Sequence, residues 1–464
     1  MSATRTTARK ATASNVDTDS GILSSVAPPV LQGKDHTGSN RIPNVVRGGG
    51  ILVALSAAAA LHLGRQREDG AWRSLWAEDG SVFLTDAHRD LVGTFLAQNG
   101  GYVHVVPRII AGVAALLPVE HAATAIAVGG SAVVALAAVF VYVASRSVLR
   151  SQWARLGLAG AVLVLPVAGS ELYANALNLH FYLLFACFWA LFWQSETWVA
   201  LGSRSAVALA ATLSDPLAAL FLPLAAVAPV AHRSLRTLAV SGSFFAGLVT
   251  QAILMRGGES PERNWVFRLG DLPDIFSLRV AGGLLVGDRY LDELWLALGR
   301  GFSYTALLVV SVVIVYLLLR STRATAAFAL ISLGYAGLFF CVHLVGRGTG
   351  GMDPELGSFH LNGARYVLLP FLFLLAALLA LIDTAGVSKM GARWMRRAAC
   401  LWLLVLLLAN YPIGPNLRSS GPRWSDELTE ARQMCATRGT PIARILVAPA
   451  PPQVWFARIP CSRP

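Results

Sequence analysis

Apolar residues form long runs along this chain, and most charged residues lie in the short stretches between them. The first run covers 48–64, and because no clear cleavage site closes it, it predicts a membrane anchor instead of a signal peptide. The further charge-poor windows are 121–145, 156–173, 179–201, 205–214, 216–231, 237–255, 301–319, 324–345, 366–383 and 398–414. A spanning helix needs about 20 apolar residues, so the pattern predicts an all-α, polytopic membrane protein of about eleven transmembrane helices.

Composition supports this class. Hydrophobic residues make up 55% of the 464 residues, and charged residues make up only 14%. Soluble domains are nearer to about a quarter charged, so a water-soluble globular protein is excluded. The net charge of +12 could indicate a nucleic-acid partner, but the basic residues form short clusters between apolar runs. Membrane lipids, and not nucleic acid, are therefore the expected surroundings.

The basic residues also predict the orientation of the helices. Alternate connections carry twelve cations, which lie on the same side as the N-terminal tail: Arg146, Arg150, Arg155, Arg204, Arg233, Arg236, Arg320, Arg323, Lys389, Arg393, Arg396 and Arg397. The opposite side holds 65–120, with five cations against seven acids, and 256–300, with six against seven. Cytoplasmic connections carry the Lys and Arg excess, so the N-terminal tail is predicted to be cytoplasmic.

This topology divides the chain into three parts. Residues 1–45 are too polar to bury a core and are expected to form a disordered cytoplasmic tail. Residues 46–412 are the transmembrane domain, and 413–464 form a small extracytoplasmic segment. The outer loops of the transmembrane domain are 65–120, 256–300 and 346–365.

Two windows do not fit plain spans. A crossing at 102–118 would place Arg146 on the outer side, so this stretch is expected to lie as an amphipathic helix in the outer interface. The windows 205–214 and 216–231 are short and meet at Ser214, Asp215 and Pro216. Broken helices occur where they line a cavity, which predicts that this break faces a site near the outer leaflet.

The C-terminal segment is predicted to be a small α/β unit. It combines a helix around 424–437 with one or two short strands in the sequence RILVAPAPPQVWFARIPC. Cys435 and Cys461 are its two cysteines, and an oxidising compartment favours a disulfide between them. In the chain-entropy model, closing such a loop stabilises the folded segment by about 3 kcal/mol. The alternative is that the two cysteines are independent thiols.

Candidate chemistry lies in the first outer loop, LWAEDGSVFLTDAHRD. Its adjacent acids Glu78 and Asp79 precede Gly80, which would free the backbone to turn. Two neighbouring carboxylates can hold a divalent metal, or one can act as a general base whose pKa the other raises. A helix N-terminal acid pair or a solvated loop would give the same pattern, and spacing leaves these alternatives open.

A phosphate ligand would need guanidinium groups near the same face, because Arg pairs bidentately with phosphate oxygens. Four arginines of the outer segments are candidates: Arg108, Arg263, Arg347 and Arg365. Cations that touch lipid headgroups are the simpler interpretation of each. Polar residues at predicted outer helix ends are His104, Asn178, His180 and His360, and interfacial hydrogen bonding would explain them equally well.

The order of WAEDG, GYVHVVPR, NLHFY and GARYVLLP after a first helix resembles bacterial members of the GT-C class of integral-membrane glycosyltransferases. The resemblance covers most of the membrane portion. It implies a polyprenyl-phosphate-linked sugar donor, a glycan, lipid or protein acceptor, and transfer of a hexosyl or pentosyl unit at the outer face of the membrane. Only three of the 38 basic residues are lysine, which is typical of a GC-rich bacterial genome, so the bacterial cytoplasmic membrane is the expected location.

The resemblance also assigns roles. Asp79, with Glu78 beside it, takes the place of the acidic base or acceptor-binding residue. The class usually has two Asp residues or Asp-Glu there, so the choice between Glu78 and Asp79 stays open, as does a divalent metal held by them. Arg365 with Tyr366 is the favoured donor-phosphate contact. Further donor contacts are expected from Arg108, His104, Asn178, His180 and Arg347.

Two other functions remain from the sequence. A flippase or secondary transporter for lipid-linked saccharides would need polar residues near the middle of the helices. The long windows 301–319 and 366–382 carry no charge, and the acids cluster outside. A polymerase or ligase of diphosphate-linked glycans would differ from the transferase only in its donor. The sequence leaves the sugar and the acceptor open.

Overall fold

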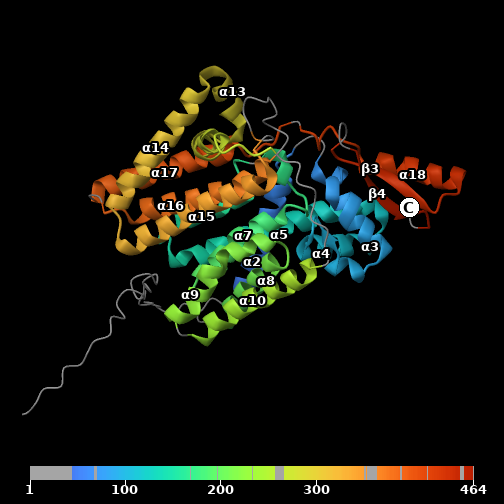
Figure 1. The fold of residues 1–464 in the computed structure, drawn as a ribbon, viewed down its shortest axis with the longest axis horizontal. Coiled ribbons are helices and arrows are strands. Elements are labelled where there is room, and N and C mark those ends of the chain that lie inside the picture. Colours follow the sequence, from blue (N-terminus) through green and yellow to red (C-terminus); the bar gives the residue numbers. More distant parts are fainter. Residues whose placement is uncertain are drawn as a thin grey trace, which may run out of the picture.

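The computed structural model describes residues 44–66, 70–167, 169–195, 197–232, 234–256, 266–349, 352, 363–386, 389–414, 416–449 and 454–462. Nearly all of the expected tail 1–45 lies outside these residues, and so do Arg263 and His360. The described chain is mostly helical, as the apolar windows predicted (Figure 1).

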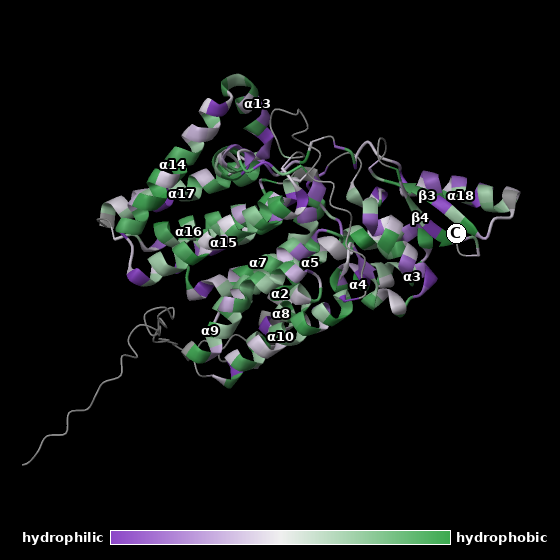
Figure 2. Cartoon of the chain, in the orientation of Figure 1, coloured by the Kyte–Doolittle hydropathy of each residue, from purple (hydrophilic) through white to green (hydrophobic). Residues whose placement is uncertain are grey.

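The apolar windows correspond to helices of one bundle. These are α2 (Asn44–Leu63), α5 (Ala122–Ala144), α6 (Gln152–Val164), α7 (Leu179–Phe192), α8 (Trp198–Thr212), α9 (Leu222–His232), α10 (Leu235–Met255), α14 (Arg300–Leu319), α15 (Arg323–Arg347), α16 (Leu368–Thr384) and α17 (Lys389–Ala409). Most residues of these helices are hydrophobic, as the colouring by residue hydropathy shows (Figure 2). α7 and α16 are enclosed by the other helices, since every residue of α7 is buried and nearly every residue of α16.

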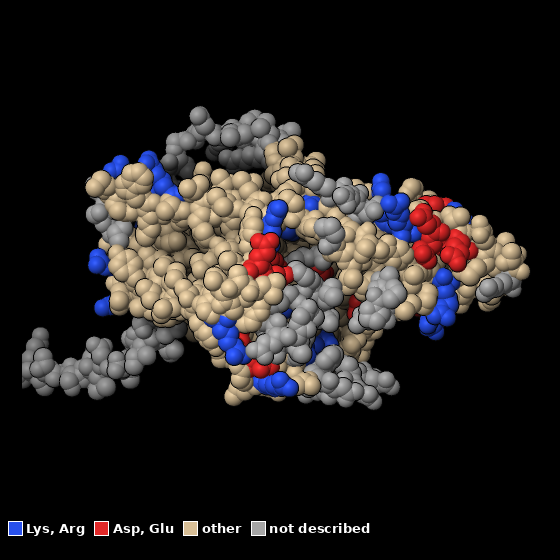
Figure 3. Space-filling model, turned by 90° about the horizontal axis from the view of Figure 1, so that it is seen from above, with Lys and Arg blue, Asp and Glu red and all other residues tan. Residues whose placement is uncertain are grey.

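Contacts between connections define two ends of the bundle. At one end the Asp383 carboxylate accepts hydrogen bonds from the backbone N–H groups of Arg150 (2.6 Å) and Ser151 (3.0 Å). At the other end Gln251 donates to the carbonyl of Val103 (3.1 Å). Figure 3 shows Lys and Arg side chains at the left end of the bundle and both signs of charge over the rest of the view. The helices thus run alternately between a cationic end and a mixed-charge end; which end faces the cytoplasm stays a prediction.

Five helices of the described chain are long and apolar enough to cross a membrane: Val119–Ser147, Leu235–Met255, Arg300–Leu319, Arg323–Arg347 and Ala364–Thr384. These helices are consistent with a multi-pass membrane protein, but the expected count of eleven is not confirmed. Several other helices are shorter because their apolar windows are divided differently from the prediction.

Three predicted windows differ from the helices. The window 156–173 does not stay helical, because α6 ends at Val164 and Leu165 adopts a left-handed φ of +40°. The windows 179–201 and 205–214 correspond to α7 and α8, and α8 begins at Trp198, directly after its N-cap Thr197. Arg204 is consequently no connection residue: it is buried in α8 and donates from Nε to the carbonyl of Ala190 (2.8 Å).

The segments expected as outer loops contain short helices and a two-stranded sheet. The first holds η1 (Ala71–Arg73), the π-helix η2 (Asp79–Leu84), α3 (Thr85–Arg89), η3 (Gly93–Leu96), β1 (Gln98–Asn99), β2 (Tyr102–Val103), α4 (Val105–Ala115) and η4 (Val119–His121). The second holds α11 (Asp271–Ile275), the π-helix η8 (Phe276–Gly282), α12 (Gly283–Val286) and α13 (Asp288–Leu298). The remaining short turns are η5 (Ser145–Ser147), η6 (Gly169–Leu172), η7 (Pro216–Phe221) and η10 (Ala364–Val367).

α4 is the helix predicted within 102–118. Its outward face is apolar, with Ile109 48%, Val113 55% and Leu116 70% exposed. Arg108 points inward and is completely buried. An apolar outer face of this kind suits contact with lipid at the membrane interface.

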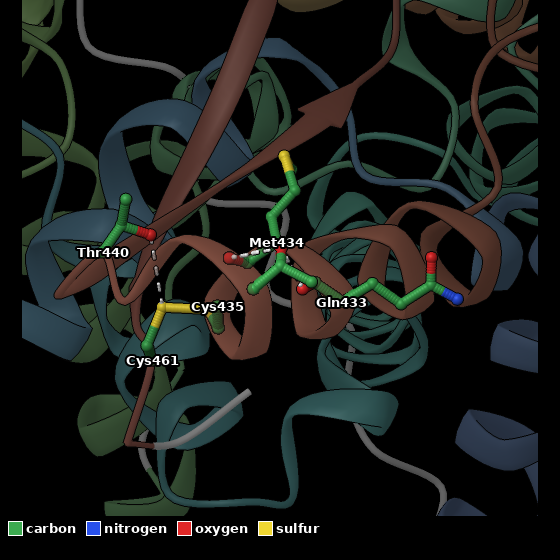
Figure 4. Close-up of a disulfide and its surroundings, with 6 residues drawn as sticks. Gln433, Met434, Cys435, Thr440 and Cys461 are labelled. Carbon is green, nitrogen blue, oxygen red and sulfur yellow. Dashed lines mark hydrogen bonds between the residues drawn. A yellow bond between two sulfur atoms is a disulfide. The ribbon is translucent and has the colours of Figure 1, made fainter.

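The C-terminal segment is the small α/β unit that the sequence predicted. α18 (Trp424–Arg438) packs on the antiparallel pair β3 (Ile442–Val447) and β4 (Trp455–Pro460). Cys435 and Cys461 form a disulfide that joins the helix to the end of β4, with their Cα atoms 5.8 Å apart (Figure 4). The unit lies at the mixed-charge end of the bundle, beside α3 (Figure 1).

Candidate functional site

The acidic loop WAEDG is held against the C-terminal unit. The N–H of Ala77 donates to the carbonyl of Ala448 (2.5 Å), and the N–H of Ala448 donates to the carbonyl of Leu75 (3.0 Å). A Cβ on Gly80 would lie 2.9 Å from Cγ1 of Val447 in β3. The expectation that Gly80 frees a turn is therefore wrong: it lies in the π-helix η2, and its missing side chain lets η2 approach β3 closely. π-helical turns are rare and often occur at functional sites.

Asp79 ties this loop to the loop before α7. Its side chain is fully buried, and its carboxylate accepts hydrogen bonds from the N–H groups of Ala176 (3.0 Å) and Leu177 (2.8 Å). Burial raises the pKa of Asp79 from 3.8 to about 7, although the two N–H donors oppose the shift. Both carboxylate oxygens are thus engaged in holding the backbone.

Left-handed backbone conformations occur on both sides of this contact. Ala77, two residues before Asp79, has a φ of +33°, and Ala174, two residues before Ala176, has a φ of +46°. A residue with a Cβ is uncommon in this region, and such strain is concentrated at functional sites. The surrounding contacts must therefore hold both loops firmly.

Arg418 of the C-terminal segment supplies such contacts. Its fully buried guanidinium donates to the carbonyls of Tyr173 (2.7 Å) and Ala174 (3.0 Å) through Nη1, and to those of Ala71 (3.0 Å) and Ser74 (3.1 Å) through Nη2. Burial lowers the pKa of Arg418 to about 10, and the nearby Asp79 charge opposes this shift. Arg418 was not predicted, because a single Arg in a polar segment gives no local signal.

Glu78 points to a different environment from its neighbour. It is half-buried, and burial raises its pKa, whereas the charges of Arg365 and Arg347 lower it. Arg365 forms an ion pair with Glu171, and its Nη2 donates to the hydroxyl of Tyr366 (3.0 Å). Glu78 thus interacts electrostatically with Arg365 and Arg347, and Arg365 contacts Tyr366; that these residues form one site stays a prediction.

Glu171 is a site residue that the sequence analysis missed. Besides its ion pair, its Oε2 accepts a hydrogen bond from the backbone N–H of Arg365 (3.0 Å). Its carbonyl accepts from the side-chain amides of Asn175 (2.7 Å) and Asn178 (2.9 Å). Asn178 therefore acts within this loop, where a sugar or phosphate contact had been expected. An acid inside an apolar window is costly, and that cost was the available signal for Glu171.

Two histidines, His180 and His104, lie near the start of α7. The Nε2 atom of His180 is 3.7 Å from Oδ2 of Asp215. Oδ1 of Asp215 accepts from the N–H of Leu217 (2.7 Å), and burial raises the pKa of Asp215 to about 7. The helix break at Asp215 thus lies next to His180; that it faces a functional site stays a prediction. His104 lies 5.9 Å from His180 between ring centroids.

Arg108 is not part of this group. Its Nη1 donates to Asp86 (3.0 Å) and to the hydroxyl of Thr94 (2.9 Å), and its guanidinium lies over the ring of Phe83. The side chain is fully buried. Arg108 therefore links α4 to α3 and η3, and its Nη1 is engaged by protein groups and not by a ligand.

A divalent metal does not fit these acids. Within the described part of the chain, no group of three or more His, Cys, Asp and Glu side chains could hold an ion. Both oxygens of Asp79 already accept backbone hydrogen bonds, and Glu78 lies in the field of two guanidinium groups.

No protein-family model, curated protein or solved structure matches this chain. The resemblance to the GT-C class therefore remains a prediction from short motifs.

Proposed function

We propose that this protein is a membrane glycosyltransferase that moves a hexosyl or pentosyl unit from a polyprenyl-phosphate carrier to an acceptor hydroxyl. The observation that supports the proposal is Glu78, a half-buried acid of the first outer segment whose carboxylate interacts electrostatically with Arg365 and Arg347. A carboxylate beside guanidinium groups suits a reaction in which a hydroxyl loses a proton and a phosphate leaves.

Glu78 is the general base of this proposal. It removes the proton of the acceptor hydroxyl while that oxygen forms a bond to the anomeric carbon. The bond from the anomeric carbon to the phosphate oxygen breaks, and its electron pair stays on the polyprenyl phosphate. Arg365 and Arg347 stabilise the charge that develops on this phosphate.

Asp79 is a positioning residue in this scheme. A base must reach the proton that it removes, and the Asp79 carboxylate is fully buried with both oxygens bonded to backbone N–H groups. Its contacts fix the backbone on which Glu78 lies. This proposal therefore gives Glu78 the role that the resemblance gave first to Asp79.

The prenyl chain would find apolar surface next to the arginines. Val345 is 64% exposed and lies two residues before Arg347 on α15. An apolar side chain exposed at the end of a candidate spanning helix suits contact with hydrocarbon. A phosphate at Arg347 and a prenyl chain along α15 are therefore compatible.

Purified full-length protein in lipid nanodiscs tests the proposal. Polyprenyl monophosphates carrying a radiolabelled hexose or pentose are incubated with glycan, lipid and peptide acceptors, and transfer is measured. Glu78→Gln should lose about a hundred- to ten-thousandfold in turnover, as general bases typically contribute. The exposed Glu120→Gln is the matched control.

Two other results would redirect the assignment. Transfer only from diphosphate-linked oligosaccharides would favour a polymerase or ligase. Translocation of glycolipid across proteoliposomes without any transfer would favour a flippase, and it would overturn the transferase.

A further inference from the structure

The sheet of the C-terminal unit carries two exposed arginines directly opposite each other. Exposure alternates along both strands, so that Ala443 and Ala457 are buried whereas Arg444 and Arg458 are exposed. The antiparallel register pairs Arg444 with Arg458 across β3 and β4. Cβ atoms of opposite residues lie about 4.5 to 5.5 Å apart, so the two guanidinium groups belong to one patch. We call this patch, with Phe456 beside it, the basic face.

No acid balances these two charges in the part of the chain that the structure describes. Like charges directly opposite each other destabilise an antiparallel pair. Within the described residues, neither Arg444 nor Arg458 forms an ion pair. The acids of the unit are Asp426, Glu427 and Glu430, and they lie on α18. An anionic partner would therefore remove a repulsion that the described chain leaves in place.

An aromatic ring orients one of the two arginines. The guanidinium carbon of Arg444 lies 4.3 Å from the ring centroid of Phe456. Phe456 belongs to the neighbouring strand, so this contact crosses the sheet. A guanidinium stacked on a ring still presents N–H donors at its edge, and these donors match carboxylate and phosphate oxygens. The basic face is thus prepared for an anion.

The basic face is joined to the WAEDG loop. The N–H of Arg458 donates to the hydroxyl of Thr85 (2.9 Å), and this hydroxyl donates to the carbonyl of Gly80 (2.9 Å). Thr85 therefore links β4 to the backbone that follows Glu78. The C-terminal unit extends beyond the end of the bundle helices, beside α3 (Figure 1). A partner on this unit is consequently a chain in the aqueous phase more readily than a lipid headgroup.

We propose that the basic face binds an anionic glycan and that this glycan is the acceptor. The inference rests on the proposed function, because it names the acceptor class of the same reaction. Carboxylate or phosphate groups of the glycan accept hydrogen bonds from Arg444 and Arg458, and a hydroxyl of a neighbouring sugar reaches Glu78. A glycan with charged repeats carries both the anions for the arginines and a hydroxyl on each sugar.

Binding of three soluble chains tests the basic face. Full-length protein in nanodiscs of zwitterionic lipid is titrated with a galacturonate oligosaccharide, a neutral glucan of the same length and poly-glutamate of the same charge. Biolayer interferometry measures the affinities. Wild-type protein should bind the galacturonate chain at least about tenfold more tightly than either other chain, and added salt should weaken this binding.

Two double variants examine the arginines. Arg444→Gln with Arg458→Gln should weaken galacturonate binding by about tenfold or more, because it removes two charged donors. Arg444→Lys with Arg458→Lys keeps both charges and should stay within about threefold of wild type. The Gln variant should melt no lower than wild type, since it relieves like-charge repulsion. Arg432→Gln is the matched control, because this exposed arginine of the same unit pairs with Glu120.

The outcomes separate the two proposals. Equal wild-type affinity for galacturonate and glucan, or unchanged galacturonate binding in the double Gln variant, overturns the basic face and leaves the proposed function standing. Equally tight binding of poly-glutamate overturns the glycan and assigns the face to acidic peptides. Absence of transfer from every polyprenyl monophosphate overturns the proposed function and the acceptor role, while the galacturonate affinities still test the basic face as a binding site.

Discussion

Substitution of Arg418 by Lys tests whether the C-terminal segment holds the proposed site together. The guanidinium of Arg418 donates to four backbone carbonyls in two separate loops. A lysine ammonium has three donors at one point, so it can satisfy both loops only in part. Loss of one or two bonds from a charged donor, at about 1.5 kcal/mol each, would cost about 1.5 to 3 kcal/mol.

This cost should appear as local opening of the loop that contains Ala176 and Leu177. About 1.5 to 3 kcal/mol corresponds to about a ten- to 150-fold rise in the exchange rate of backbone amides there. Hydrogen exchange with mass spectrometry on peptides covering 171–178 measures it. A peptide from α15 should not change.

Arg432→Lys is the matched control, because Arg432 is an exposed arginine of the same segment that pairs with Glu120. It should leave exchange at 171–178 unchanged. Equal exchange in Arg418→Lys and wild type would refute the argument, since the loop would then be held without these bonds.

Four further predictions follow from the same contacts. Glu78→Gln should abolish transfer with little change in thermal stability. Asp79→Asn should lower both transfer and thermal stability, because the Asn side chain offers one acceptor oxygen to two N–H donors. Equal thermal stability of the two variants would contradict this assignment. Because burial raises the pKa of Asp215 from 3.8 to about 7, folding favours the protonated acid, and the free energy of unfolding should fall by up to about 4 kcal/mol as the pH rises from about 4 to about 7. In thermal melts, Asp215→Asn should make the melting temperature depend less on pH. An unchanged pH dependence in this variant would contradict the prediction. Cys435→Ser should destabilise the C-terminal unit by about 3 kcal/mol, seen as faster proteolysis of α18, and recovery of both cysteines as free thiols in native membranes would reject the bond. Cysteine labelling should reach position 430 from outside the cell and position 150 only from inside; an external 150 would show that the interfacial interpretation of 102–118 is wrong.

The parts that local patterns encode were predictable. The apolar windows located most helices, the turn and strand signals located the C-terminal unit, and the two outer cysteines predicted their disulfide. Glu78, Arg365 and Tyr366 were predicted to serve one site; Arg365 bonds to Tyr366 and interacts electrostatically with Glu78, and their shared role stays a prediction. These predictions needed only residue type and the side of the membrane on which each segment falls.

Residues that act through distant partners were not predictable. Arg418 bonds to carbonyls more than 240 positions away, and no periodicity reports such a contact. Arg108 had the right type and side for a phosphate contact, yet Asp86 and Thr94 engage it. The end of α6 at Val164 was missed because the residues after it remain apolar, so hydropathy does not mark where the helix stops.

The contact of the first outer segment with the last residues of the chain has a consequence for biosynthesis. WAEDG is made early, but its backbone partner Ala448 and the Arg418 clamp are made only after the last bundle helix. A growing chain can therefore insert its helices one by one while Glu78 still lacks its final position. The backbone around Glu78 would reach its final position only after Ala448 has been made, so transfer by the proposed site would begin only after that point.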